Sequence, residues 1–273
     1  MKFLMLLFHR FWLYFADRDR SITGAQDASE ATPADSVRVH PVGQAPVPEL
    51  AFEYQGQLVP ESTDPPKPLP HYLGRYTWCI NRAHGALQAG KRSPVRSETG
   101  RRFLEWEWAD KIVDLIIEQL EEIGVSYFEV VPEANVGQFL RGRVDRANNH
   151  VAPLPKVYLS VHANAGPAPD LDTWSSAAGT ETWCYHQSAK GRKMADIFQR
   201  KLVAATGFKD RGVRSRPEGQ FYELRATHMP SVLTEAGFYN NVTECRQLTD
   251  PAVMQRIADA HVEAILEIEE LGL

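Results

Sequence analysis

Two stretches, KVYLSVHANAG (156–166) and PSVLTEAGFYNN (230–241), decide the fold. Each is a short apolar run that ends in a polar residue and continues into small residues. Runs of this kind are typical of buried strands in an α/β sheet, where functional groups gather at the carboxyl ends of the strands. We therefore predict that His162 and Glu235 lie at that edge of a sheet.

Around these stretches, short apolar runs alternate with longer segments of helical periodicity. We predict strands at 76–80, 126–131, 156–161, 180–185 and 230–236, and helices at 103–123, 190–205 and 251–270. The first helix ends before Gly124, and Pro251 opens the last, as proline often does in a first helical turn. The pattern predicts an α/β fold with a mixed, mainly parallel twisted sheet flanked by helices and with an N-terminal extension.

The extension differs in composition from the rest of the chain, since nine of the 18 prolines lie between positions 33 and 70. We predict an N-terminal helix and a Pro-rich arm or linker at 1–70, and one ordered α/β domain at 71–273. Residues 1–15 are too short and too charged to span a bilayer. A signal peptide, a helix that contacts a membrane or a partner, and a helix packed on the domain stay open as alternatives for them.

Overall composition excludes several classes of protein. The 273 residues carry a net charge of −5 and are 43% apolar, which is typical of a soluble globular protein and argues against a nucleic-acid binder. Three cysteines without a CxxC pair exclude a disulfide framework and a thiolate metal site. Cys79 and Cys184 fall in predicted strands, so we expect them to pack in the core.

Four polar residues follow apolar runs or open a helix: His84, Glu105, His162 and Glu235. Two imidazoles and one carboxylate form a ligand set typical of catalytic zinc, which keeps one position open, and a further carboxylate could act as base. Other interpretations remain for each. His84 could be a hydrogen-bonded structural histidine, Glu105 a favourable charge in a first helical turn, and Glu107 the ligand in place of Glu105.

The motifs around these residues, in this order, resemble those of the third class of zinc-dependent N-acetylmuramoyl-L-alanine amidases. That family includes bacterial cell-wall enzymes and phage endolysins, and the resemblance covers about residues 76–270. The motifs are NRAHG (81–85), the 19-residue step from Glu105 to Gly124, LRGRVDRAN (140–148), LSVHAN (159–164), DRGV (210–213), YELRATHMP (222–230) and PSVLTEAGFYNN (230–241).

The resemblance implies that His84, Glu105 and His162 bind Zn²⁺ and that Glu235 is the catalytic base. The implied reaction is hydrolysis of the amide bond between N-acetylmuramic acid and the L-alanine of the peptidoglycan stem peptide. Zinc would lower the pKa of its water and polarise the carbonyl, and Glu235 would move the proton to the leaving amine.

The resemblance also implies lesser roles for residues around the site. Asn164 and Arg225 are candidate substrate contacts, and Arg143 is expected to anchor its loop. Residues 81–83 are Asn, Arg and Ala where the family usually has Asp, Pro and Gly. A carboxylate that could orient the first imidazole is therefore missing from this position, which can alter metal affinity.

Two alternative functions stay open. A zinc carboxypeptidase would also use two histidines and a glutamate, but that class expects HxxE, whereas His84 and Glu105 are 21 residues apart. A non-catalytic wall-binding or virion structural protein could keep the fold. The expected partner is peptidoglycan, without nucleic acid or a transmembrane segment, and residues 1–70 could contact a partner or a membrane. The expected site of action is the bacterial cell envelope, with a phage lysin slightly favoured over a secreted bacterial enzyme.

Overall fold

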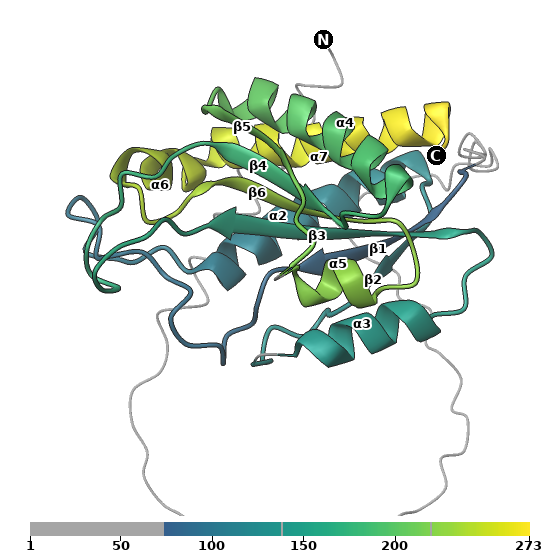
Figure 1. The fold of residues 1–273 in the computed structure, drawn as a ribbon. Coiled ribbons are helices and arrows are strands. Elements are labelled where there is room, and N and C mark those ends of the chain that lie inside the picture. Colours follow the sequence, from purple (N-terminus) through teal and green to yellow (C-terminus); the bar gives the residue numbers. More distant parts are fainter. Residues whose placement is uncertain (1–73, 138, 219) are drawn as a thin grey trace, which may run out of the picture. The chain divides into compact units, whose positions relative to one another are not determined.

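The computed structural model describes residues 74–273, except residues 138 and 219, as a twisted sheet flanked by helices (Figure 1). The predictions for residues 1–70 lie outside the described residues. The strands are β1 (Thr77–Arg82), β2 (Tyr127–Glu129), β3 (Lys156–Asn164), β4 (Thr180–Cys184), β5 (Asp210–Arg214) and β6 (Ser231–Phe238). In the part of the chain that is described, no helix has the length and apolar character needed to cross a bilayer.

The strands are arranged in the order β2-β1-β3-β6-β4-β5. The first four are parallel to one another, β4 is antiparallel to β6, and β5 is parallel to β4. The prediction of a mixed, mainly parallel sheet is confirmed. Because β1, β3 and β6 are adjacent and parallel, their carboxyl ends meet at one edge of the sheet. The candidate residues His84, His162 and Glu235 lie in or just after these strands, towards that edge.

Helices cover both faces of the sheet (Figure 1). They are α2 (Glu105–Ile123), α3 (Leu140–Asn149), α4 (Ala189–Thr206), α5 (Tyr222–Ala226), α6 (Val242–Leu248) and α7 (Pro251–Leu271). The larger core lies between the sheet and α2, α4 and α7. A smaller cluster on the face of α3 and α5 includes Cys79 and Tyr158. Cys79 and Cys184 are both buried, as expected.

Strand alternation divides the polar from the apolar side chains. Val157, Leu159 and Val161 belong to the larger core, so the alternate residues of β3, Ser160 and His162 among them, point to the other face. β3 continues to Asn164, three residues beyond the predicted end, because its polar residues still form the ladder with β6. The candidate metal ligand His162 and the candidate base Glu235 are therefore held inside paired strands and not on loops.

A buried histidine on α7 gives the fold a pH dependence. His261 is fully buried, with Nδ1 at 2.8 Å from the carbonyl of Ile257 and Nε2 at 3.0 Å from the hydroxyl of Thr234. Burial lowers the pKa of His261 to about 4, and the hydrogen bond to the Ile257 carbonyl opposes that shift. In the unfolded chain the pKa of the imidazole is about 6.5. The folded state therefore binds fewer protons, and this part of the stability is full above pH ~6.5 and is lost as the pH falls towards 4.

Acidification from pH 7 to pH 4 is expected to remove about 3 kcal/mol of unfolding free energy through this group. His261→Gln lacks the titrating ring, so its urea unfolding free energy should fall less over the same range. Equal slopes of unfolding free energy against pH in the two proteins would show that His261 does not cause the dependence.

Candidate metal centre

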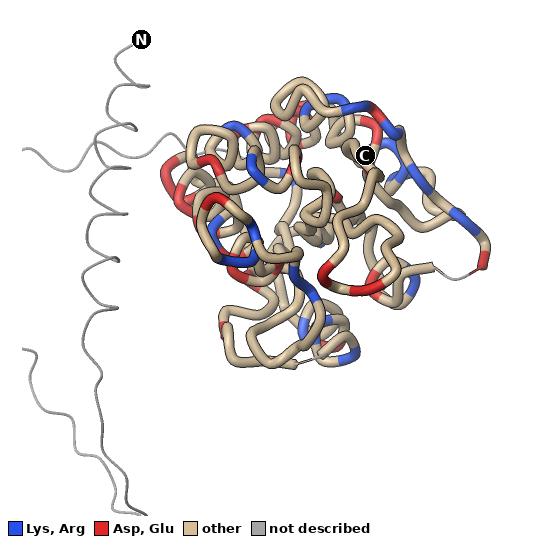
Figure 2. Tube along the Cα trace, turned by 90° about the vertical axis from the view of Figure 1, so that its left-hand side faces the viewer, with Lys and Arg blue, Asp and Glu red and all other residues tan. Residues whose placement is uncertain are grey.

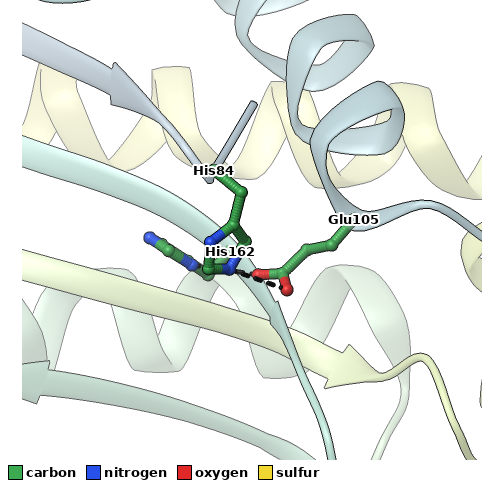
Figure 3. A group of neighbouring side chains, drawn as sticks. All are labelled: His84, Glu105 and His162. Carbon is green, nitrogen blue, oxygen red and sulfur yellow. Dashed lines mark hydrogen bonds and ion pairs between the residues drawn. The ribbon is translucent and has the colours of Figure 1, made fainter. Parts of the chain in front are cut away.

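Three side chains from three elements converge at the carboxyl edge of the sheet (Figure 3). His84 follows β1, Glu105 is the first residue of α2, and His162 lies in β3. Nε2 of His84 is 2.9 Å from one Glu105 oxygen, and Nδ1 of His162 is 2.9 Å from the other. Their candidate ligand atoms all lie within 4.8 Å of one another. Two imidazoles and a carboxylate at this spacing are able to hold one metal ion.

Glu105, and not Glu107, is the carboxylate of this group. Glu105 is 3% exposed, whereas Glu107 is exposed on the outer side of α2. Burial raises the pKa of the Glu105 carboxyl, but the hydrogen bonds from His162 and His84, together with their charges, outweigh this and bring it down to about 2. Glu105 is thus held as a carboxylate, the form that binds metal.

Each imidazole is oriented through its second nitrogen. Nδ1 of His84 is 2.9 Å from Oε1 of Gln88, and Nε2 of His162 is 3.0 Å from Oγ of Ser160. Such outer hydrogen bonds fix the tautomer and the direction of a metal-binding histidine. Gln88 therefore provides for His84 the orienting acceptor that the sequence lacks at position 81.

The turn that carries His84 has an unusual backbone. His84 has φ 55°, in the left-handed region, and a Cβ on Gly85 would come within 2.3 Å of the Val136 carbonyl oxygen. Arg143 of α3 donates to the backbone carbonyls of Arg82 and His84. Arg143 was expected to anchor its own loop, but it lies in α3 and instead anchors the turn of His84. The glycine at position 85 permits the close approach of this turn to residue 136.

Glu235 lies beside this group. It is opposite His162 in the parallel ladder of β3 and β6 and is 7% exposed. Among the described residues, its Oε2 atom has no hydrogen-bond donor. Burial raises the pKa of the Glu235 carboxyl well above its usual value, and the charges of Glu105 and Glu181 raise it further, while Lys91 opposes the rise. A buried carboxylate oxygen without a hydrogen-bond donor is costly, so its presence next to a ligand triad indicates a functional group.

Comparison with known proteins agrees with this arrangement. A family model described as N-acetylmuramoyl-L-alanine amidase matches residues 79–267. The chain belongs to the N-acetylmuramoyl-L-alanine amidase family. The matched range contains His84, Glu105, His162 and Glu235, and the family traits fit a metal cofactor held by the first three.

Individual relatives include both bacterial and phage proteins. The catalytic domain of the N-acetylmuramoyl-L-alanine amidase CwlV from Bacillus (Paenibacillus) polymyxa var. colistinus is 25% identical, with a TM-score of 0.59 over 72% of this chain and 99% of that one. The amidase LytC of Bacillus subtilis (strain 168) is 32% identical over 42% of this chain and 22% of that protein. The endolysin of Bacillus phage SPP1 is 30% identical over 59% of this chain and 58% of its own. The matches thus span less than two thirds of these two curated relatives.

The two predicted substrate contacts lie in different places. Asn164, at the end of β3, donates to Glu181 at 2.9 Å, and Glu181 is opposite Glu235 in the ladder of β4 and β6. Arg225 lies over the Tyr222 ring, 4.9 Å from its centre, and lines a separate pocket with Tyr185. The structure therefore places Asn164 next to the site of this amidase-family chain and does not bring Arg225 to the metal ligands.

Glu181 lies next to Glu235 in the sheet, and the sequence did not single it out. It is 5% exposed, and its carboxylate is 2.6 Å from Nε of Arg211 and 3.7 Å from Nε of Arg214. Basic residues gather along edge strand β5 and the loop after it (Figure 2). Glu181 was missed because it lies early in a strand whose place beside β6 requires the sheet order.

The hydrogen bond between Nδ1 of His84 and the accepting Oε1 of Gln88 gives a testable expectation. Gln88→Leu keeps approximate size but removes the acceptor for Nδ1 of His84, so the imidazole loses its orientation. We expect the dissociation constant of a bound divalent metal ion, measured with Zn²⁺ as the probe, to rise about 10-fold or more, as for other outer partners of metal ligands. Titration against a competing chromophoric chelator measures it. An unchanged dissociation constant would show that Gln88 does not orient His84.

Proposed function

We propose that this chain is a zinc-dependent peptidoglycan amidase that hydrolyses the amide bond between N-acetylmuramic acid and the L-alanine of the stem peptide. One observation carries the proposal. Glu235 has a buried carboxylate, and its Oε2 atom accepts no hydrogen bond from the described residues. It lies on the strand next to His162, which forms the ligand triad together with His84 and Glu105. The family match and the names of the relatives support the substrate.

Zinc is the metal that best suits this donor set. Two neutral imidazoles and one carboxylate are the protein ligands of several catalytic zinc sites, and three ligands leave a position open. When bound, zinc supplies Lewis acidity, which lowers the pKa of water and polarises a carbonyl. The Oε2 atom of Glu235 fits this site, because a water in the open position would give it a hydrogen-bond donor.

Glu235 would carry the proton through the reaction. Its carboxylate takes a proton from the attacking water, whose oxygen forms a bond to the lactyl carbonyl carbon. The carbon–nitrogen bond then breaks, and Glu235 delivers the proton to the departing amine of L-alanine. Burial raises the pKa of Glu235 above its usual value, and a raised pKa makes this carboxylate a better proton acceptor than an ordinary glutamate.

The surrounding residues would hold the substrate. We propose Asn164 as a contact close to the scissile bond, since it lies at the end of β3, two residues after His162, and hydrogen-bonds to Glu181 beside Glu235. Arg225 would contact only a part of the substrate remote from that bond. The proposed place of action is the bacterial cell envelope, where cell-wall amidases and a phage endolysin among the relatives act.

Mass spectrometry of digested peptidoglycan tests the proposed reaction. The amidase is expected to release stem peptides with a free L-alanine amino terminus. Shortened stems that remain attached to muramic acid would indicate a zinc carboxypeptidase instead, and unchanged muropeptides would indicate a non-catalytic wall-binding protein.

A further inference from the structure

A buried polar network lies beneath the metal ligands, on the sheet face that α3 and α5 cover. Its members are Asn81 in β1, Arg143 in α3, Tyr158 and Ser160 in β3, and Glu223 in α5, and each of them is at most 4% exposed. The network includes a positive and a negative charge, and such groups are costly to bury unless they are paired.

Asn81 bridges the two charges. Its Oδ1 atom accepts a hydrogen bond from Arg143 at 2.6 Å, and its Nδ2 atom donates to Glu223 at 2.8 Å. The acceptor faces the cation and the donor faces the anion, so the orientation of this amide is determined by its neighbours. The hydroxyl of Tyr158 also donates to Glu223, at 2.7 Å.

The network reaches both histidine ligands. Through its second hydrogen, Nδ2 of Asn81 donates to Oγ of Ser160 at 2.9 Å, and this oxygen is 3.0 Å from Nε2 of His162. On the other side, Arg143 donates to the carbonyl of His84. Burial lowers the pKa of Arg143, and the charge of Glu223 opposes that shift.

We propose that Glu223 is a positioning residue of the metal centre: its charge neutralises Arg143 through Asn81, and this network orients His162 through Ser160 and holds the turn of His84. The proposal rests on the proposed metal role of His84, Glu105 and His162. Without the Glu223 charge, Arg143 would be left buried without compensation, and the hydrogen bond from Asn81 to position 223 would lose its charge-assisted strength.

The test compares zinc affinity in full-length variants, by competition with a chromophoric chelator. Glu223→Gln keeps the shape and removes the charge, and we expect its zinc dissociation constant to rise about 10-fold. Adding Asn81→Asp returns a carboxylate to the network, where it can accept from Arg143 and from the amide introduced at position 223. The double variant should therefore recover most of the lost affinity.

Glu269→Gln is the matched control. Glu269 is about as buried as Glu223, at 3% exposed, but it accepts from the Trp78 indole in the larger core on the other face of the sheet. It should keep the wild-type zinc affinity even where it lowers the unfolding free energy. Unchanged affinity in Glu223→Gln, an equal loss in Glu269→Gln, or no recovery in the double variant would each overturn the proposal.

A second measurement does not depend on zinc or on lysis. In metal-free protein, Glu223→Gln is expected to shift the ¹⁵N NMR signal of the His162 Nε2 atom, and Glu269→Gln is not. If Glu223→Gln does not fold, Ser160→Ala breaks the same network nearer to His162 and should give both effects. An unmoved His162 signal would contradict the proposal, whereas absent zinc binding in the wild type would contradict the proposed function alone.

Discussion

Glu235→Gln is expected to lose peptidoglycan hydrolysis while it keeps its metal. General-base catalysis typically raises a rate by about 10²–10⁴-fold, so we expect kcat to fall by at least about 10²-fold. Glutamine preserves the volume of the side chain but cannot accept the proton of the attacking water. Glu235 is not one of the three converging ligands, so zinc affinity should stay within about 3-fold of the wild type, well below the loss typical of an altered metal partner.

The same variant should not be less stable than the wild-type protein in the absence of metal. The raised pKa of Glu235 means that its charged form is disfavoured by burial and by Glu105 and Glu181, and glutamine removes that charge. Loss of lysis without a loss of unfolding free energy therefore separates catalysis from folding. Full lytic activity in Glu235→Gln would remove Glu235 from the role of base.

Glu105→Gln is expected to abolish zinc binding and, with it, lysis. This carboxylate contacts both histidines of the triad and is held ionised, with a pKa of about 2. Its loss should raise the zinc dissociation constant by more than about 100-fold, the upper end for outer partners of metal ligands. Glu107→Gln, two residues away on the exposed side of the same helix, is the matched control and should behave as wild type.

Chelation completes this second test. Removal of metal from the wild type should stop lysis, and zinc should restore it. Free zinc at about 100 times its dissociation constant should also raise the unfolding free energy by about 2.7 kcal/mol. Neither effect is expected in Glu105→Gln. Lysis that resists the chelator, or equal zinc affinity in the Glu105 and Glu107 variants, would exclude the triad as the metal site.

The sequence predicted β1, β3 and β6 because these strands are buried and form nearly continuous apolar runs. It also predicted the residues that converge, since His84, His162 and Glu235 end or follow such runs. The choice between Glu105 and Glu107 depended on family spacing, because both are acidic residues of one first helical turn. Their different burial follows from how the helix packs, and this was available only in the structure.

Other parts of the fold could not be predicted from local patterns. The five-residue helix α5 is too short for a periodic signal, and edge strand β5 carries more charge than a typical strand. In the sequence, Glu223 is not distinguished from other acidic residues. Its hydrogen bond with Asn81 follows only from the packing of α5 against the sheet. Arg225 lies two residues further along this helix, and its role as a substrate contact stays a prediction.

The central claim is that this site uses water to break the bond between muramic acid and L-alanine. The most direct measurement is digestion of peptidoglycan in water enriched in ¹⁸O, by zinc-loaded wild type and Glu235→Gln in parallel. We predict one ¹⁸O atom in the lactyl carboxyl group of muramic acid, a free amino group on L-alanine, and neither product with Glu235→Gln. Incorporation of ¹⁸O into a carboxyl group of the stem peptide, with the lactyl amide intact, would contradict the account.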